Sequence, residues 1–462
     1  MKRFEIAILL QIACVILPSV VAPGQAPTDR DVANQLTAYL KPFAETGNLS
    51  GTVLVARGGR VLFRQSYGMA SYELQVPNST ETRYHIASVS KPFTATAILQ
   101  LQEQGRLSVS DPVSRFVPDF PNGERITLNN LLIHTSGIHE INDLDDYDTF
   151  ARSPHTIQQL VAKVAGLPLD FPPGTKTAYS NSNYELLALV VEKASGESYE
   201  DYLRKHIFEP VGMQNSGADG DATRVIPSLA SGYLPAGISG YEKAIYLDWS
   251  NKTGSGSLYS TVDDLYRFDR ALNTDTLVKT ATRQKYFVEG EDNYYGWYIF
   301  KRVGHNLMAA KGRGPGFTAE LDRYPDDDVT IILLTNSNST VSQGPIAPGV
   351  AAIVFGQQPS QSAPVYAAKF PQSLLESYAG HYQYGPEYFD ANAKFTLTAK
   401  PGFLLMEIGE QHMPLVPLSQ TEFLERKFFG RIVISTDAGG KVTGLTTRYG
   451  EKTFIARRLD AK

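Results

Sequence analysis

The stretch Ser88-Val89-Ser90-Lys91 stands directly before a run with a helical pattern, Pro92 to Gln104. A serine three residues ahead of a lysine, where a helix opens, puts a hydroxyl and an amine on one face, one turn apart. The amides of the first helical turn lie nearby and can hold a developing anion. A Ser-x-x-Lys pair arises by chance about once per few hundred residues at average composition, so the rest of the chain must decide whether it is catalytic.

The bulk composition is that of an ordinary globular protein. The chain has 462 residues, of which 42% are apolar and 20% charged, enough for two or three domains with sizeable cores. A net charge of -5 without a basic run argues against nucleic acid as the main partner. We therefore expect a small-molecule or peptide substrate.

The N-terminus has the features of a secretory signal peptide. A basic start, Met1-Lys2-Arg3, precedes an apolar run from Ile6 to Val21, and small residues follow at Ala22 and Ala26. This pattern predicts a signal peptide over residues 1–26, with cleavage near Ala22 or Ala26, and export to the periplasm or the extracellular space. No later segment is long and apolar enough to span a membrane.

The pattern from residue 27 to 356 predicts one α/β (α+β) domain. A helix-like run is followed by two β-like runs, a long helical stretch dominates to about Gly220, and three more β-like runs end the region. If the two groups of strands join, they form an antiparallel sheet flanked by helices, with an all-helical insertion between its halves. The expected strands are 51–56, 60–65, 306–311, 317–324 and 329–335.

The last part of the chain differs from the rest in composition and in its pattern of apolar residues. The polar, proline-containing stretch from Gln357 to Pro364 is typical of a linker, which we place at 357–369. Residues 370–462 then form many short β-like runs separated by turns such as Asp437-Ala438-Gly439-Gly440. This spacing predicts a small all-β barrel or sandwich.

Serine chemistry needs partners that Ser88 and Lys91 do not supply alone. A serine hydroxyl is a poor nucleophile without a base, and a lysine acts as that base only if its pKa is depressed. The motif Tyr179-Ser180-Asn181 offers a phenol that can relay protons and an amide that can fix the lysine. Such chemistry needs no cofactor, and the eight histidines show no metal-ligand spacing.

These motifs together resemble the serine β-lactamase-related family. Two further motifs support the likeness, the run from Leu131 to Gly137 and the glycine-rich segment from Gly312 to Phe317, and all occur in family order over roughly residues 30–355. The pattern is similar to class C β-lactamases, D,D-peptidases, D-aminopeptidases and related esterases. The C-terminal segment resembles the lipocalin-like β domains that are appended to such hydrolases.

The resemblance implies a role for each matching residue. Ser88 would be the acylated nucleophile and Lys91 its proton acceptor. Tyr179 would be a second base that protonates the leaving group and later activates water, while Asn181 positions Lys91 and the substrate. The oxyanion would rest on the backbone N–H groups of Ser88 and Arg313.

One motif departs from the family pattern. The family places a Lys or His, a small residue and a Gly on the strand that lines the pocket, and the aligned triplet here is Ala310-Lys311-Gly312. A shift of one residue along a strand turns a side chain to the opposite face. Either a bulge brings Lys311 into the pocket, or the pocket lacks this cation and Arg313 or nothing replaces it.

The sequence therefore predicts an exported serine hydrolase that cleaves an amide or ester through an acyl-Ser88 intermediate. A D-amino-acid peptide, a β-lactam and a small ester all remain possible substrates. One alternative is a carboxylesterase of the same fold, and another is a degenerate member that binds a ligand without catalysis. The substrate-binding candidates are Asn181, Lys311, Gly312 and Arg313, and the oligomeric state stays open.

Overall fold

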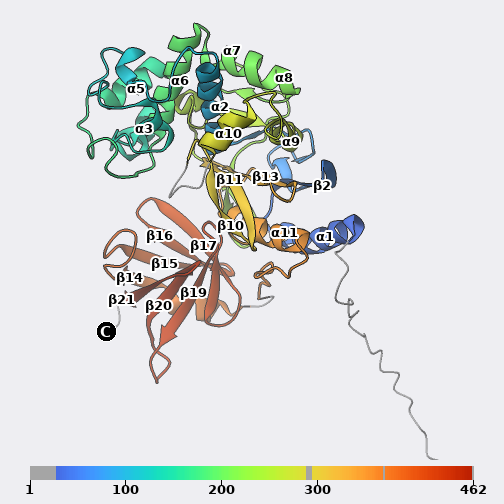
Figure 1. Ribbon diagram of the computed structural model, residues 1–462. Helices are drawn as coiled ribbons and strands as arrows, with labels where there is room; N and C mark the ends of the chain where they lie inside the picture. The colour runs from blue at the N-terminus through green and yellow to red at the C-terminus, as the bar shows by residue number, and fades with distance from the viewer. Residues whose placement is uncertain (1–27, 288–293, 368–369, 460–462) are drawn as a thin grey trace, which may run out of the picture.

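A computed structural model describes residues 28–287, 294–367 and 370–459. The predicted signal peptide at 1–26 lies outside these residues. The chain forms a mixed part, in which helices surround a sheet, and a separate C-terminal barrel (Figure 1). This arrangement confirms the predicted fold class.

The central sheet has six antiparallel strands and joins the two ends of the mixed part. β13 pairs with β1, so strands more than 250 residues apart in the sequence lie side by side, as in the pair Val53 and Leu333. The expected strands are all present, but the edge strand β10 was not predicted. The order across the sheet is β10 (Tyr298–Arg302), β11 (His305–Gly314), β12 (Phe317–Tyr324), β13 (Val329–Thr335), β1 (Gly51–Arg57) and β2 (Arg60–Tyr67).

The two faces of the sheet bury two different cores. Side chains alternate along a strand, so Val53 and Val55 of β1 pack in the core beneath α1 and α11, whereas Leu54 and Ala56 join the core of the helical region. α1 (Asp29–Glu45) begins at a capping box formed by Thr28, and α11 is Ala347–Val354. The helices of the other side are α2 (Lys91–Glu103), α3 (Leu128–Leu132), α4 (Tyr147–Phe150), α5 (Ile157–Ala165), α6 (Asn181–Ser195), α7 (Tyr199–Leu203), α8 (Glu209–Val211), α9 (Val262–Ala271) and α10 (Thr280–Tyr286).

Short elements complete the mixed part. The paired strands are β3 (Met69–Ser71) with β4 (Val76–Pro77), β7 (Tyr233–Ala236) with β8 (Gly240–Lys243), and the three-stranded sheet β5 (Tyr84–His85), β9 (Leu258–Ser260) and β6 (Gly217–Ala218). The 3-10 and π-helical turns are η1 (Ala87–Ser90), η2 (Val113–Arg115), η3 (Ile141–Asp143), η4 (Arg204–Phe208), η5 (Trp249–Lys252) and η6 (Ser342–Ile346).

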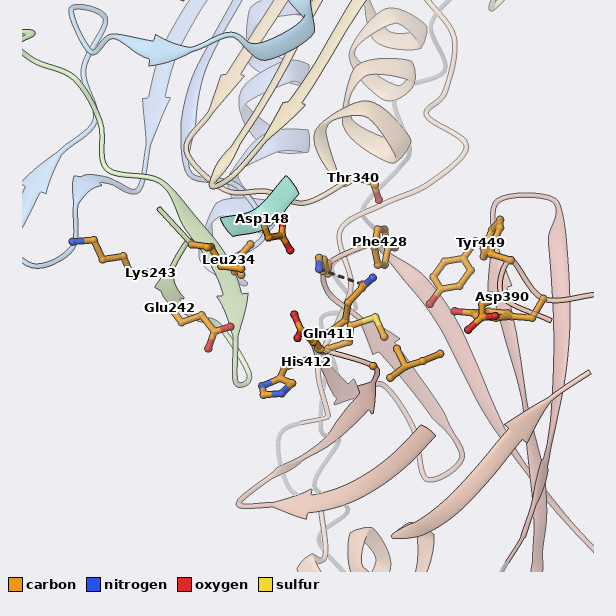
Figure 2. A pocket seen from close by; sticks show the side chains of 18 residues that line it. Asp148, Leu234, Glu242, Lys243, Thr340, Asp390, Gln411, His412, Phe428 and Tyr449 are labelled. Carbon is orange, nitrogen blue, oxygen red and sulfur yellow. Dashed lines mark hydrogen bonds between the residues drawn. The ribbon is translucent and has the colours of Figure 1, made fainter. Parts of the chain in front are cut away.

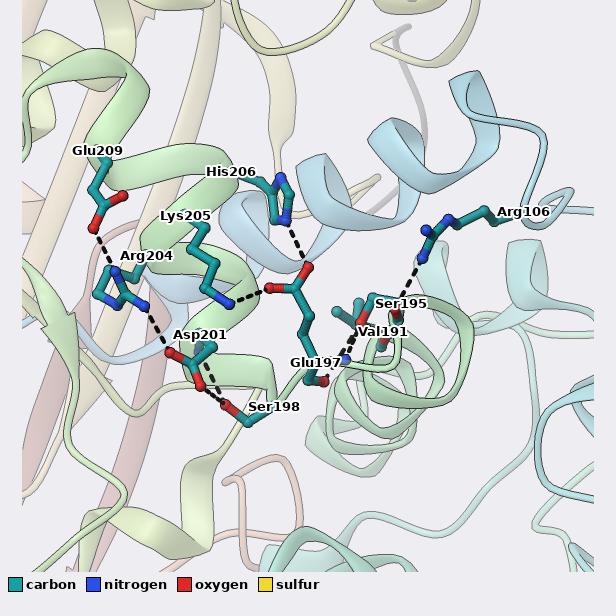
Figure 3. Close-up of polar contacts among 10 residues, drawn as sticks. All are labelled: Arg106, Val191, Ser195, Glu197, Ser198, Asp201, Arg204, Lys205, His206 and Glu209. Atoms are coloured by element: carbon teal, nitrogen blue, oxygen red, sulfur yellow. Dashed lines mark hydrogen bonds and ion pairs between the residues drawn. The ribbon is translucent and has the colours of Figure 1, made fainter.

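A network of surface charges connects the helices that follow α6 (Figure 3). Glu197 accepts hydrogen bonds from Lys205 and His206, each 2.8 Å long, and Arg204 bridges to Asp201 and Glu209. All these side chains are partly exposed, and exposed ion pairs contribute at most about 1 kcal/mol each. The network therefore orients α7 and η4 without dominating the stability of the region.

The C-terminal barrel is closed by eight antiparallel strands in sequence order. β14 pairs with both β15 and β21, so the barrel has no free edge. The strands are β14 (Gly380–Tyr384), β15 (Lys394–Lys400), β16 (Phe403–Ile408), β17 (Gln411–Pro417), β18 (Glu422–Glu425), β19 (Gly430–Thr436), β20 (Val442–Tyr449) and β21 (Lys452–Arg458), and α12 (Gln372–Tyr378) precedes them. β17 and β18 were not predicted, because Pro414 and Pro417 interrupt the strand pattern of the first.

The barrel is fixed to the mixed part by a buried arginine. Arg426 is fully buried and donates hydrogen bonds to the backbone oxygens of Gly47, Ala236 and Gly240. Its own backbone oxygen accepts from Ser339 Oγ at 2.8 Å. A charged group without water is tolerated only where its donors are satisfied, so these contacts hold the two parts in one arrangement. Within the described ranges, no helix is long and apolar enough to cross a membrane.

Candidate active site

Ser88 lies on the 3-10 turn η1, immediately before α2. Ala87, the residue before it, has a φ of 46°, a conformation that a residue with a Cβ rarely adopts. Ser88 itself is partly exposed, whereas its neighbours Ala87 and Val89 are buried. The backbone thus presents the hydroxyl at the surface from a rigid, buried turn.

Lys91 is fully buried and is the hub of the site. Its Nζ donates to Ser88 Oγ at 3.0 Å, to Asn181 Oδ1 at 2.8 Å and to the backbone oxygen of Ser255 at 2.9 Å. Burial, opposed in part by nearby Glu140, lowers the pKa of Lys91 to about 7. A substantial fraction of the amine is therefore unprotonated near neutral pH and can accept a proton.

Tyr179 approaches Ser88 from the other side. Its hydroxyl donates to Ser88 Oγ at 2.8 Å, and its ring stacks on His134 with 4.5 Å between centroids. The residue is 38% exposed, but its hydroxyl end points into the site, where burial raises the pKa well above the ordinary tyrosine value. Tyr179 is therefore a neutral phenol at rest.

Asn181 begins α6 and is held by a carboxylate that sequence reasoning missed. Its backbone N–H donates to Glu140 Oε2, and its Nδ2 donates to Glu140 Oε1 at 2.8 Å. Because the carboxylate can only accept, the amide must turn Nδ2 toward Glu140 and Oδ1 toward Lys91. No motif marks Glu140 in the sequence, because its role depends on a tertiary contact with Asn181, which lies 41 residues further along the chain.

Further polar and charged groups surround Lys91, some of them buried. Ser255 Oγ donates to Glu185 Oε1 at 3.2 Å, and burial raises the pKa of Glu185. Lys252 donates to Asn142 Oδ1, and its charge opposes protonation of Lys91. The electrostatic setting of Lys91 is thus shaped by charges from three separate loops and helices.

The third motif lies on β11, close to the nucleophile. A Cβ built on Gly312 would stand 2.1 Å from the oxygen of Ile86 and 3.0 Å from the nitrogen of Ser88, so only glycine allows this approach. β10 pairs with β11 only as far as Ala309. Among the described strands, the edge of β11 from residue 310 to 314 is therefore open toward the site.

Lys311 lies on the face of β11 opposite Gly312. The pairing between β11 and β12 runs from Met308 to Gly314 without a shift in register, so no bulge turns the strand there. Lys311 consequently shares the face of Ala309, and its Nζ stands 5.4 Å from the ring centroid of Phe300. The buried residue on the Gly312 face is Ala310, which carries no charge.

Arg313 also turns its side chain away from Ser88. Its guanidinium donates to Asn338 Oδ1 at 3.1 Å and lies 5.3 Å from the ring centroid of Phe428, a residue of the barrel. The structure thus brings Ser88, Lys91, Tyr179 and Asn181 together and places Gly312 beside them. The side chains of Lys311 and Arg313 lie apart from this group.

Comparison with known families agrees with this geometry. The β-lactamase family model matches residues 35–354. The chain belongs to the β-lactamase family. It is 30% identical over 419 residues to penicillin-binding protein 4* of Bacillus subtilis, which covers 85% of this chain and 91% of that protein. Family membership and these relatives identify the chain as a serine hydrolase.

Solved structures of related proteins have the same fold. The penicillin-binding protein of Bacillus halodurans matches this β-lactamase-family hydrolase with a TM-score of 0.60 and 28% identity, over 68% of this chain and 100% of that one. The octameric penicillin-binding protein homologue of Pyrococcus abyssi matches with a TM-score of 0.63 and 23% identity, over 91% of this chain and 99% of that one. In the described part of this chain, no group of three or more His, Cys, Asp or Glu residues is placed to hold a metal ion.

Proposed function

We propose that this hydrolase cleaves an amide or ester bond through an acyl-Ser88 intermediate. The observation that carries the proposal is the pair of contacts on Ser88 Oγ, 3.0 Å from Lys91 Nζ and 2.8 Å from Tyr179 Oη. A hydroxyl held between a base and a proton donor is arranged for nucleophilic attack. The N-terminal pattern further leads us to propose that the enzyme is exported.

Lys91 takes the proton of Ser88 in the first step. A neutral amine has two N–H groups and one lone pair, and the two fixed acceptors at Asn181 Oδ1 and Ser255 O hold both N–H groups. The lone pair then points at Ser88 Oγ. As Ser88 Oγ attacks the substrate carbonyl carbon, its proton moves to Lys91, and the carbonyl oxygen becomes an anion.

The oxyanion needs donors at the junction of η1 and β11. We assign this role to the backbone N–H groups of Ser88 and Arg313, which flank the close approach of Gly312 to Ser88. The open edge of β11 lies at the same place and can pair with the backbone of a substrate. Neither function requires the side chain of Arg313.

Tyr179 completes the proton path as a relay. Its raised pKa makes it a poor resting base, so we modify the role that the sequence suggested. As the tetrahedral intermediate collapses, the phenol gives its proton to the leaving group, and the resulting phenolate takes a proton from protonated Lys91. Ser88 Oγ is acylated and carries no proton at this stage, so this transfer runs directly from Nζ to Oη, which flank Oγ at 3.0 and 2.8 Å. The same relay, run in reverse, removes a proton from the water that attacks the acyl-enzyme.

Labelling with a fluorescent fluorophosphonate tests the nucleophile. The wild-type enzyme should be labelled covalently, and Ser88→Ala should not be. Ser90→Ala is the matched control, because Ser90 is a buried neighbour whose Oγ accepts from the backbone of Leu258, and it should keep the label. Equal labelling of the wild type and Ser88→Ala would refute the proposal.

A carboxylesterase is the second candidate, and Ala310 favours it. The family position that supplies a cation for a substrate carboxylate is occupied here by this buried alanine. Kinetics with a p-nitrophenyl ester, a chromogenic cephalosporin and a D-Ala-D-Ala peptide would rank the substrates. A preference for the ester favours the carboxylesterase, and efficient removal of the terminal D-Ala would contradict it, since that substrate presents a free carboxylate.

A further inference from the structure

A cavity of about 980 Å³ lies where the barrel meets the mixed part (Figure 2). Ligand pockets in proteins commonly have volumes of about 300–1,000 Å³, so this space is large enough for a peptide segment. Its walls come from α4, from the hairpin β7–β8 and from loops and strands of the barrel. None of Ser88, Lys91 and Tyr179 lines it, so it is a space separate from the catalytic group.

Two series of contacts nevertheless connect the lining of the cavity with the surroundings of the catalytic site. On one side it is lined by Asp148, which follows Tyr147 in α4, and the Tyr147 ring centroid stands 4.6 Å from Lys252 Nζ behind Lys91. On the other side it is lined by Phe428, whose ring lies against Arg313. Arg313 follows Gly312, the glycine that packs against the turn of Ser88, so Phe428 connects this wall of the cavity with the strand beside the nucleophile.

The barrel loop that forms this wall is held in a fixed conformation. The buried carboxylate of Glu425 accepts from the backbone N–H groups of Lys427, at 2.5 Å, and Phe428, at 2.8 Å. The backbone oxygen of Lys427 in turn accepts from the N–H of Thr340 at 2.9 Å. Together with the contacts of buried Arg426, these hydrogen bonds fix the position of Phe428 at the interface between the barrel and the mixed part.

The chemistry of the walls favours a protonated amine carried on an apolar chain. Carboxylates attract cations more strongly than aromatic faces do, and here the rings of Phe428 and Phe389 already face cations of the chain itself, Arg313 and Lys427 in the first case and Lys452 in the second. The selection therefore depends on the carboxylates. Four carboxylates line the cavity, and none of them makes an ion pair within the described residues; only two lysines line it, and Lys427 Nζ donates to Gln411. The carboxylates are Asp148, Glu242, Asp390 and Glu410, and the aromatic residues are Tyr388, Phe389, Phe428 and Tyr449.

We propose that this cavity binds the distal part of an extended peptide substrate whose scissile bond lies at Ser88, and that it selects a chain carrying a protonated amine. This inference rests on the proposed function. The barrel then acts as a specificity domain, because the bond-breaking residues all come from the mixed part while the barrel supplies most of the distal wall.

Charge-matched peptides test the selection. Two pairs of peptides carry a lysine three residues from the scissile bond, one pair on the acyl side and one on the leaving side, and each pair differs only by acetylation of the lysine Nε. For at least one pair, the wild-type kcat/KM should be about fivefold or more higher for the free amine. The variant Asp390→Asn/Glu410→Gln should lose most of this preference, since it keeps the shape of the walls but removes two charges.

Glu376→Gln is the matched control. Glu376 is an exposed carboxylate of α12 that does not line the cavity, so its removal should leave the amine preference unchanged. No preference in the wild type, or an equal preference in the wild type and the double variant, would overturn the inference.

A binding measurement separates this inference from the proposed function. Calorimetry with the Ser88→Ala enzyme measures the affinity for the lysine peptide without turnover, and adding Asp390→Asn/Glu410→Gln should weaken it by about fivefold. Hydrolysis of p-nitrophenyl acetate that does not depend on Ser88 would refute the proposed function alone. Ser88-dependent hydrolysis with no effect of the two carboxylates on peptide binding would refute the cavity assignment alone.

Discussion

Replacing Glu140 by glutamine tests the positioning of the catalytic base. In the wild type both oxygens of Glu140 accept from Asn181, one from its backbone N–H and one from Nδ2. Glutamine has one acceptor, so one donor of Asn181 loses its partner or faces an NH₂ group. A hydrogen bond to a charged group is worth about 1.5–3 kcal/mol, which corresponds to a fall in kcat/KM of about 10- to 160-fold.

The same substitution also makes a prediction about pH. The negative charge of Glu140 raises the pKa of Lys91, against the larger effect of burial. Its removal lowers that pKa, so a larger fraction of Lys91 is unprotonated at a given pH, and the acidic limb of the kcat/KM profile moves to lower pH. A merely structural role for Glu140 would reduce activity without moving this limb.

The assay is the kcat/KM of a neutral p-nitrophenyl ester across the acidic and neutral range, for the wild type, Glu140→Gln and Asp143→Asn. Asp143 is an exposed carboxylate of the neighbouring turn η3, so Asp143→Asn makes a similar change of charge without a contact to Asn181. The control should keep the wild-type rate and profile. A Glu140→Gln enzyme with kcat/KM within about twofold of wild type and an unmoved acidic limb would refute the reasoning.

Three further outcomes are expected. The wild-type kcat/KM for the same ester should rise with pH through about 7, because Lys91 must lose its proton before it can accept that of Ser88; a profile that is flat there contradicts the assignment. Lys311→Ala should keep kcat/KM within about threefold, because the side chain lies opposite Gly312, and a loss of several orders of magnitude would show that it reaches the substrate. Arg426→Ala should lower the free energy of unfolding in urea by about 3 kcal/mol or more, since it removes the donor that several part-buried carbonyls share at the interface; Arg431→Ala, at a partly exposed position of the barrel, should not.

Much of the fold was predictable because local patterns and tertiary structure agree. The turn at Gly58-Gly59 joins β1 and β2 as expected, and Gly196, with a φ of 78°, ends α6. The missed elements are those without a local signal. β10 ends in two adjacent cations, Lys301 and Arg302, and is recognised as a strand only by its pairing with β11. The interrupted β17 is stabilised by neighbours on both sides.

The candidate site was predictable where a motif carries it. Ser88, Lys91, Tyr179 and Asn181 were named from short patterns, and they contact one another. Glu140 was not, because any exposed loop contains similar carboxylates and only the fold brings this one to Asn181. The orientation of Lys311 could not be decided in advance either, since it depends on whether β11 contains a bulge, which no residue type at this position reveals. The domain bounds 27–356, 357–369 and 370–462 stay predictions.

The contacts of Arg426 have a consequence for how the chain folds. Gly47, Ala236 and Gly240 lie in stretches of the mixed part that are synthesised well before residue 426, and each accepts a hydrogen bond from a donor that arrives 186 to 379 positions later. Gly47 O also accepts from Tyr241 Oη within the mixed part. N-terminal segments fold first during synthesis, so these carbonyls remain hydrated until the barrel forms and inserts its arginine. The last step of folding is therefore the docking of the barrel, and a chain that stops within the linker would leave the surface around Gly47, Ala236 and Gly240 uncovered by the barrel.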